Sequence, residues 1–167
     1  MQDRAVIMLV EDREDDVLLV RKSFQKAYID NPLQVVRDAE AAMHYLAGEG
    51  PFANRAEYPL PDLILLDLKL PGMDGFDLLR WIRRQPGFGS IAVVVLTSSD
   101  AIRDANRAYA LGANSFLVKP LDFENFIETA TTLKKFWLKT CKRPEATRPK
   151  QQTGSTAPDP LRTSQGH

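Results

Sequence analysis

Five short apolar runs alternate with segments of helical periodicity along most of this chain. The first run, 5–10, is almost entirely apolar, which is typical of a strand covered on both faces. The other four runs are at 33–36, 62–66, 91–96 and 115–118. Between them, and after the last, apolar residues recur every three or four positions, as expected of amphipathic helices. This alternation predicts an α/β fold, a doubly wound five-stranded parallel sheet with helices on both faces.

Chemically active side chains follow four of the five predicted strands. Glu11 and Asp12 come after the first strand, Asp67 after the third, Thr97 after the fourth and Lys119 after the fifth. In a parallel doubly wound sheet, reactive groups gather beyond the carboxyl ends of the strands. We therefore expect these five side chains to share one pocket.

Each of these residues has an ordinary explanation when it is considered alone. Acidic residues after the first strand could cap the next helix, and we expect Asp15 and Asp16 to do only that. Thr97 could simply end a strand, and Lys119 could be a surface charge. Taken together, these ordinary explanations are less convincing, because the five side chains all fall at the ends of strands, and four different strands are involved.

A pocket with three carboxylates is costly unless a cation neutralises it. Oxygen ligands suit a hard ion, and Mg²⁺ is commonly held by one or two carboxylates and a phosphate oxygen. This pattern predicts a Mg²⁺-assisted phosphoryl site in which Asp67 is the nucleophile. Lys119 would pair with one phosphoryl oxygen, and the hydroxyl of Thr97 would donate a hydrogen bond to another.

Four segments carry a family resemblance: LVED, LILLDLKLPGMDG, VVVLTSS and ANSFLVKP. With them the chain resembles the receiver domain of bacterial two-component response regulators, over about residues 5–138. The resemblance implies the flavodoxin-like receiver fold with strand order 2-1-3-4-5. It also implies a phosphoprotein that is not an ordinary enzyme. Asp67 would accept a phosphoryl group from a histidine of a sensor kinase, and the protein would catalyse its own Mg²⁺-dependent phosphorylation and dephosphorylation.

The same resemblance assigns the metal ligands. Asp12 and Asp67 would bind Mg²⁺ directly, Glu11 through water, and Lys69 through its backbone carbonyl.

The resemblance also assigns the parts of a switch. The peptide bond between Lys119 and Pro120 would be cis. Thr97 and Phe116 would form a switch pair, in which the hydroxyl moves toward the phosphoryl group and the ring turns inward.

Two further segments, GEGPFANRAEYPLPDLILLD and FENFIETATTLKKFWLK, resemble the stand-alone regulators that partner bacterial phytochromes. That subgroup implies a phytochrome-type kinase as partner. It also implies a homodimer through the face formed by the fourth helix, fifth strand and fifth helix, with Phe136, Trp137 and Leu138 as contacts. The alternative is that Phe136 and Trp137 complete the core.

Composition limits the remaining possibilities. Lys and Arg total 22, as do Asp and Glu, so no net charge favours nucleic acid or an anionic membrane. Cys141 is the one cysteine, and no apolar run is long enough to span a membrane, so we expect a cytoplasmic protein. We expect a receiver domain at 1–141, with an exposed loop at 48–61. The polar segment 142–167 is expected to be disordered.

Three alternative functions remain open beside the signalling switch. An aspartyl-phosphate phosphohydrolase commonly has a second acid two residues after its nucleophile, where this chain has Lys69. A receiver that only binds partners would not need the complete set of phosphoryl-site residues. A nucleotide-binding protein would be expected to have a glycine-rich loop after the first strand, which this sequence lacks.

Overall fold

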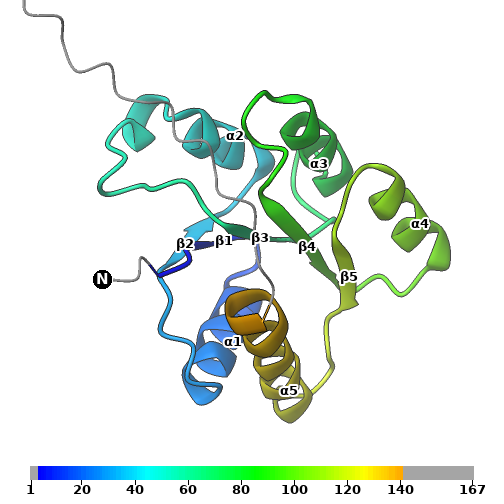
Figure 1. The fold of residues 1–167 in the computed structure, drawn as a ribbon. Coiled ribbons are helices and arrows are strands. Elements are labelled where there is room, and N and C mark those ends of the chain that lie inside the picture. Colours follow the sequence, from blue (N-terminus) through cyan, green and yellow to red (C-terminus); the bar gives the residue numbers. More distant parts are fainter. Residues whose placement is uncertain (1–3, 141–167) are drawn as a thin grey trace, which may run out of the picture.

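One parallel sheet forms the centre of the molecule (Figure 1). The computed structural model describes residues 4–140. The strand order is β2-β1-β3-β4-β5, which confirms the predicted fold class and topology. The strands are β1 (Ile7–Val10), β2 (Leu33–Val36), β3 (Leu63–Leu66), β4 (Ala92–Thr97) and β5 (Ser115–Val118).

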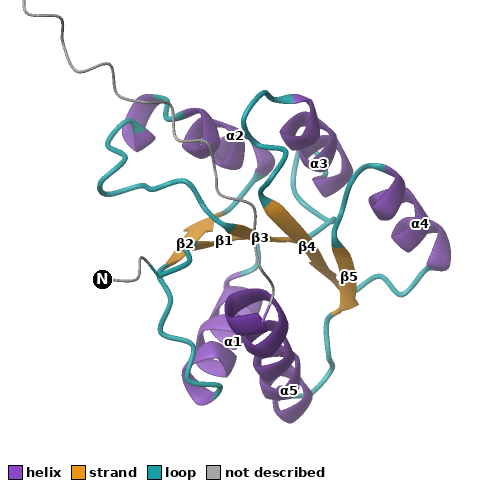
Figure 2. Cartoon of the chain, viewed as in Figure 1, coloured by secondary structure: helices purple, strands orange, loops and turns teal. Residues whose placement is uncertain are grey.

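Helices cover both faces of this sheet, so that the strands lie between two helical layers (Figure 2). α1 and α5 lie on one face, while α2, α3 and α4 lie on the other (Figure 1). The helices are α1 (Glu14–Lys26), α2 (Ala39–Ala47), α3 (Gly75–Arg84), α4 (Ile102–Ala110) and α5 (Phe123–Leu133). A short 3-10 helix, η1, spans Gly50–Phe52, and a π-helix, η2 (Lys134–Thr140), continues from α5.

The two faces of the sheet build two separate hydrophobic clusters. Alternate residues of β3 point to opposite sides, so Ile64 and Leu66 pack under α2 and α3, while Leu63 and Leu65 pack under α1 and α5. All four are buried, and burying one such side chain contributes roughly 1.5–3 kcal/mol. The central strands are therefore firmly held, whereas β5, at the edge, is only partly covered.

Three of the helices begin at an aspartate cap. The carboxylates of Asp38, Asp74 and Asp122 accept hydrogen bonds from the backbone N–H groups of the third residues of α2, α3 and α5. Each bond satisfies an amide that the helix leaves without a partner and contributes about 1 kcal/mol. Asp74 is important for the site, because it determines where the chain re-enters a helix after β3.

The segment 48–61 is largely exposed, as its polar composition predicts, but side chains within it also attach it to α2. Phe52 and Tyr58 pack against Tyr45 of α2, with ring centroids 5.2 and 5.8 Å from that ring. Arg55 donates hydrogen bonds of 2.7 and 2.6 Å to the carbonyls of Tyr45 and Leu46. These carbonyls lie in the last turn of α2; that of Tyr45 also accepts a 3.1 Å hydrogen bond from the N–H of Gly48, so the arginine adds to the capping of this helix end. The segment is therefore tied to α2.

The terminal segments lie mostly outside this description. Cys141 and the predicted disordered tail, 142–167, fall outside the described residues. Within 4–140, no helix is both long enough and apolar enough to cross a membrane.

Candidate functional site

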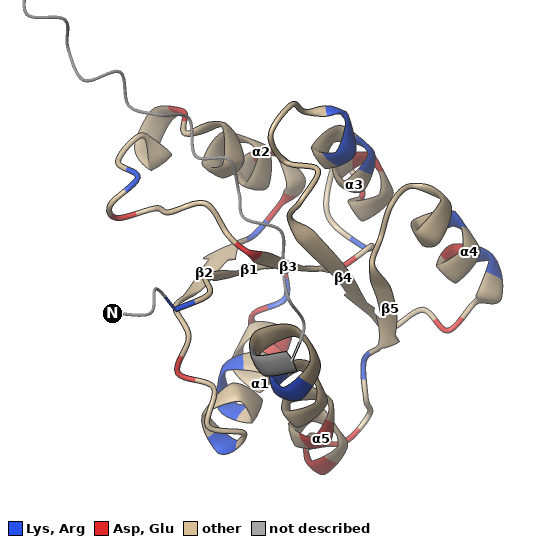
Figure 3. Ribbon diagram, viewed as in Figure 1, with Lys and Arg blue, Asp and Glu red and all other residues tan. Residues whose placement is uncertain are grey.

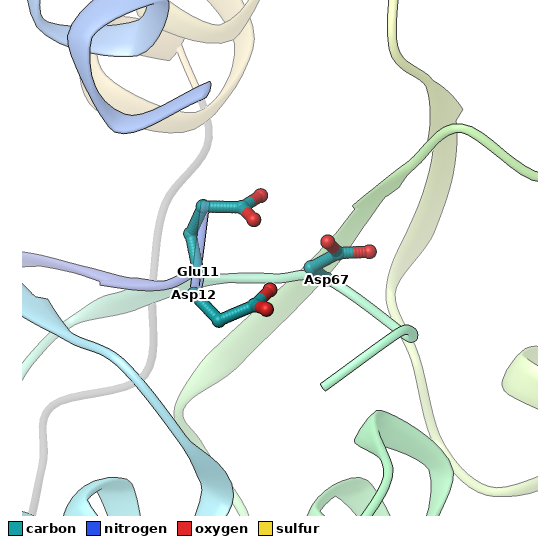
Figure 4. Close-up of side chains that lie close together, drawn as sticks. All are labelled: Glu11, Asp12 and Asp67. Carbon is teal, nitrogen blue, oxygen red and sulfur yellow. The ribbon is translucent and has the colours of Figure 1, made fainter. Parts of the chain in front are cut away.

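Three carboxylates meet at the carboxyl edge of the sheet. Glu11 and Asp12 follow β1, and Asp67 follows β3, whose last residue pairs with the last residue of β1. The backbone N–H of Asp67 donates a 3.1 Å hydrogen bond to Val10, which fixes the two strand ends side by side. One oxygen from each carboxylate lies within 4.8 Å of the others, and Figure 4 shows the three side chains gathered together. The three carboxylates therefore lie close together at this edge, as expected from the strand ends.

The loop that follows Asp67 depends on a glycine. Gly75 opens α3, and its N–H donates a 3.0 Å hydrogen bond to the carbonyl of Leu68. A Cβ at this position would lie only 2.4 Å from the backbone oxygen of Asp67 and 2.7 Å from Cα of Leu68. Only a residue without a side chain allows α3 to start this close to the nucleophile.

Negative charge is in excess within this cluster. Glu11 and Asp67 are buried, and Asp12 is exposed. Burial raises the pKa of Glu11 to about 7, and the charge of Asp67 contributes to the rise, although Lys119 opposes it. Two carboxylates at 4.8 Å repel by about 3 kcal/mol in a partly screened environment. The donor set is entirely oxygen, so the cluster fits a hard divalent cation such as Mg²⁺.

Lys119 brings the opposite charge from beyond β5. Its ammonium lies 2.5 Å from Glu11 Oε2, 2.9 Å from Asp16 Oδ2 and 3.2 Å from Asp67 Oδ2. Its side chain is only 8% exposed. Burial by itself lowers the pKa of Lys119, but the hydrogen bonds to Glu11 and Asp16 and the nearby carboxylate charges outweigh it, so the pKa is raised. The ammonium is therefore protonated, and three carboxylates surround it.

Asp16 is a site residue that the sequence reasoning missed. The expectation that it only favours the start of α1 was wrong, because it accepts a hydrogen bond from Lys119. Side chains on a helix tilt toward its N-terminus, and Asp16 is in the first turn of α1. That tilt allows its carboxylate to reach the strand ends, but Asp15 shares the same turn and is exposed, so no pattern in the sequence singles out Asp16.

The peptide bond between Lys119 and Pro120 was predicted to be cis, and this prediction is contradicted. Among the described residues no peptide bond is cis. The trans isomer is the lower in energy for a bond to proline, by about 0.5–1 kcal/mol. Here the lysine reaches the carboxylates in the trans form, and its N–H is held by a 2.7 Å hydrogen bond to the carbonyl of Thr97.

Thr97 and Phe116 lie on the same side of the sheet. Thr97 is the last residue of β4 and is fully buried, and its hydroxyl oxygen accepts a 3.4 Å hydrogen bond from the N–H of Ser99. Phe116 pairs with Val95, two residues before Thr97, and packs partly buried against the cluster under α2 and α3. Residues two apart on a strand share a face, so both side chains point toward α3 and α4.

A cavity of about 550 Å³ opens beside the carboxylates. Asp67 itself is only 4% exposed, because Lys119 covers its carboxylate. The backbone N–H of Lys69 donates a 3.2 Å hydrogen bond to Asp67 Oδ1, and its side chain is exposed. The cavity is lined by Asp12, Leu68, Lys69, Leu70, Pro71, Asp74, Phe76, Ser99, Asp104 and Arg107.

The three predicted dimer contacts differ in exposure. Phe136 is 53% exposed, while Trp137 and Leu138 are partly buried against the cluster under α1 and α5. The rings of Phe136 and Trp137 meet edge to face at 5.1 Å. Trp137 and Leu138 therefore help to cover the core, as the alternative interpretation held for Trp137, while Phe136 is mainly exposed.

Comparison with known proteins agrees with this geometry. Residues 7–131 match the family model of the response regulator receiver domain. The chain is 38% identical over 141 residues to Response regulator Rcp1 of Synechocystis sp., covering 84% of this chain and 94% of Rcp1. It is also 38% identical over 138 residues to the probable methanogenesis regulatory protein FilR2 of Methanothrix harundinacea, covering 82% of this chain and 86% of FilR2.

Solved structures show the same fold. The phosphorylated cyanobacterial phytochrome response regulator RcpA superposes with a TM-score of 0.78 and is 35% identical, covering 84% of this chain and 99% of RcpA. The Mn²⁺-bound form of Rcp1 gives a TM-score of 0.76 at 38% identity, covering 84% of this chain and 99% of that one.

Proposed function

The chain belongs to the response regulator receiver domain family, and from this membership we propose that Asp67 accepts a phosphoryl group from a histidine of a sensor kinase. One observation supports this most strongly. Asp67, the acidic pair Glu11 and Asp12, and the ammonium of Lys119 converge beside an open cavity. This is the charge arrangement that phosphoryl transfer to a carboxylate requires.

In the proposed transfer, phosphorus exchanges one bonding partner for another. A carboxylate oxygen of Asp67 forms a bond to phosphorus while the bond from phosphorus to the donor's histidine nitrogen breaks. The electron pair of that bond stays with the imidazole. Glu11, Asp12, Asp67 and the backbone carbonyl of Lys69 would hold Mg²⁺, which when bound reduces the repulsion between the carboxylate and the anionic phosphoryl group. Lys119 would pair with a phosphoryl oxygen.

Phosphorylation would then be read through the packing near β4 and β5. We propose that the hydroxyl of Thr97 moves toward the phosphoryl group and that the ring of Phe116 turns into the space it leaves. The shared side of the sheet supports this pairing, since both residues face α3 and α4. The phosphoryl group would thereby shift the equilibrium between two arrangements of Thr97 and Phe116 rather than create a new structure.

The proposed partner is a sensor kinase of the phytochrome type. The solved relative RcpA is a phytochrome response regulator, and its likeness to this chain covers nearly its whole length. We propose a homodimer through the α4, β5 and α5 face, in which Phe136 is the contact and Trp137 and Leu138 support it from within. A kinase of this kind phosphorylates its regulator in the cytoplasm, so that compartment is part of the proposal.

The alternatives receive less support. Lys69 stands where a phosphohydrolase commonly has its second acid, and its exposed side chain lies at the cavity. A receiver that only binds partners would not need Lys119 and three carboxylates held in contact. Acidic and basic residues share α1 and α4 (Figure 3), unlike the basic face with which proteins bind nucleic acid.

Intact mass after incubation with Mg²⁺ and acetyl phosphate tests the proposal. We expect one phosphoryl group on the wild type and none on Asp67→Asn. Asp74→Asn is the matched control, because it removes a carboxylate from the same cavity while asparagine keeps the helix cap. Phosphate on Asp67→Asn, or its absence from the folded control, would contradict the assignment to Asp67.

A further inference from the structure

The ammonium of Lys119 has as many carboxylate partners as it has N–H donors. An ammonium carries three donors, and Glu11, Asp16 and Asp67 each accept one, at 2.5, 2.9 and 3.2 Å. All four side chains are at most 18% exposed. A phosphoryl oxygen can be bonded by this ammonium only if one of the three partners is given up.

The three partners are not equivalent. Glu11 and Asp67 belong to the carboxylate group whose oxygens lie close enough to share one metal ion, and Asp16 does not. A cation held by that group would draw Glu11 and Asp67 away from Lys119. Asp16 would then be the carboxylate that stays with the ammonium.

We propose that Asp16 is a positioning residue, which keeps the ammonium of Lys119 beside Asp67 when the metal and the phosphoryl group occupy the site. This proposal rests on the phosphoacceptor function proposed above. Asp16 comes from the first turn of α1 and Lys119 from the residue after β5, so their contact joins two elements about a hundred residues apart in the chain. Without it, the flexible lysine would be held only by groups that the metal also needs.

Beryllofluoride, a mimic of the phosphoryl group, tests the proposal when its affinity is measured by calorimetry in the presence of Mg²⁺. We expect Asp16→Ala to weaken binding about tenfold, in line with a hydrogen bond to a charged group. Asp15→Ala is the control, because it removes the same charge from the neighbouring exposed position, which is not among the three partners of Lys119. The control should change affinity less than about twofold.

The decisive comparison repeats Asp16→Ala in a Lys119→Ala background. If Asp16 acts through Lys119, the second loss should disappear, because the two effects are not additive. An equal loss in both backgrounds, a loss matched by Asp15→Ala, no loss, or tighter binding would each overturn the proposal. Asp16→Asn, which keeps the size of the side chain, replaces Asp16→Ala if the alanine variant unfolds.

A Mg²⁺ titration without beryllofluoride separates this inference from the proposed function. In Asp16→Ala, the ammonium has only Glu11 and Asp67 left, so Mg²⁺ must compete with it and should bind several-fold more weakly than to the wild type or Asp15→Ala. Wild type that takes neither phosphate nor beryllofluoride would refute the proposed function, while this titration would still test Asp16. Equal Mg²⁺ affinity in the three proteins would refute the positioning role alone.

Discussion

Gly75→Ala offers the sharpest test of how the fold positions the nucleophile. The added methyl group would lie 2.4 Å from the backbone oxygen of Asp67, whereas carbon and carbonyl oxygen normally approach to about 3.3 Å. The loop must therefore move by roughly 1 Å. Overpacking of this kind costs about 1–3 kcal/mol, and it exceeds the gain in helix propensity of up to about 1 kcal/mol at the end of a helix. We expect a net loss near 2 kcal/mol.

Urea denaturation and thermal melting measure this loss directly. A loss of 2 kcal/mol corresponds to a fall of roughly 6 °C in Tm for a domain of this size. The same displacement moves the carboxylate of Asp67, so phosphorylation by acetyl phosphate should slow by about tenfold or more. Gly89→Ala is the matched control, because no atom lies within 4 Å of a Cβ there and its φ is not in the left-handed region.

The control should be as stable as the wild type or more stable by up to about 1 kcal/mol. If Gly75→Ala matched Gly89→Ala in stability and in rate, the close approach of α3 to Asp67 would not be what places the nucleophile.

Three further outcomes are expected. Folding raises the pKa of Glu11 from 4.5 to about 7, so the folded protein binds this proton more tightly than the unfolded chain. Without metal, the free energy of unfolding should therefore fall by about 3 kcal/mol as the pH rises from 4.5 to 7. Urea titrations measure this fall, and Glu11→Gln should not show it. Arg55→Ala should lower the free energy of unfolding by about 2 kcal/mol through its two hydrogen bonds to α2, while the phosphorylation rate by acetyl phosphate stays unchanged. Phe136→Ala should reduce the mass in light scattering without lowering Tm, whereas Trp137→Ala should lower Tm; the reverse pattern would contradict the dimer contact.

Strand positions and most site residues were predictable from the sequence. The reason is that a parallel sheet converts short apolar runs into strand ends at a common edge, so Glu11, Asp67 and Lys119 could be brought together without coordinates. The strand order came from the family resemblance instead, and the structure agrees with it.

Other features depend on three-dimensional contacts that no local pattern encodes. Asp16 looked like Asp15 in the sequence, and only the direction of its side chain brings it to Lys119. The segment 48–61 is polar in composition, yet Arg55 and two aromatic rings bind it to α2. Asp67 ends its strand as predicted, but the same lysine that completes the site also covers it.

The partial covering of β5 has a mechanical consequence. β1 and β3, which lead into the acidic residues, lie in the middle of the sheet, whereas β5 has one neighbouring strand and is only partly buried. Elements with fewer buried contacts deform at a lower cost in free energy. The central strands therefore stay rigid, whereas Phe116 and Lys119 belong to the edge of the sheet that deforms more easily. Strain introduced among the carboxylates would be relieved by movement at this edge, where a partner can bind the displaced surface while the core keeps its shape.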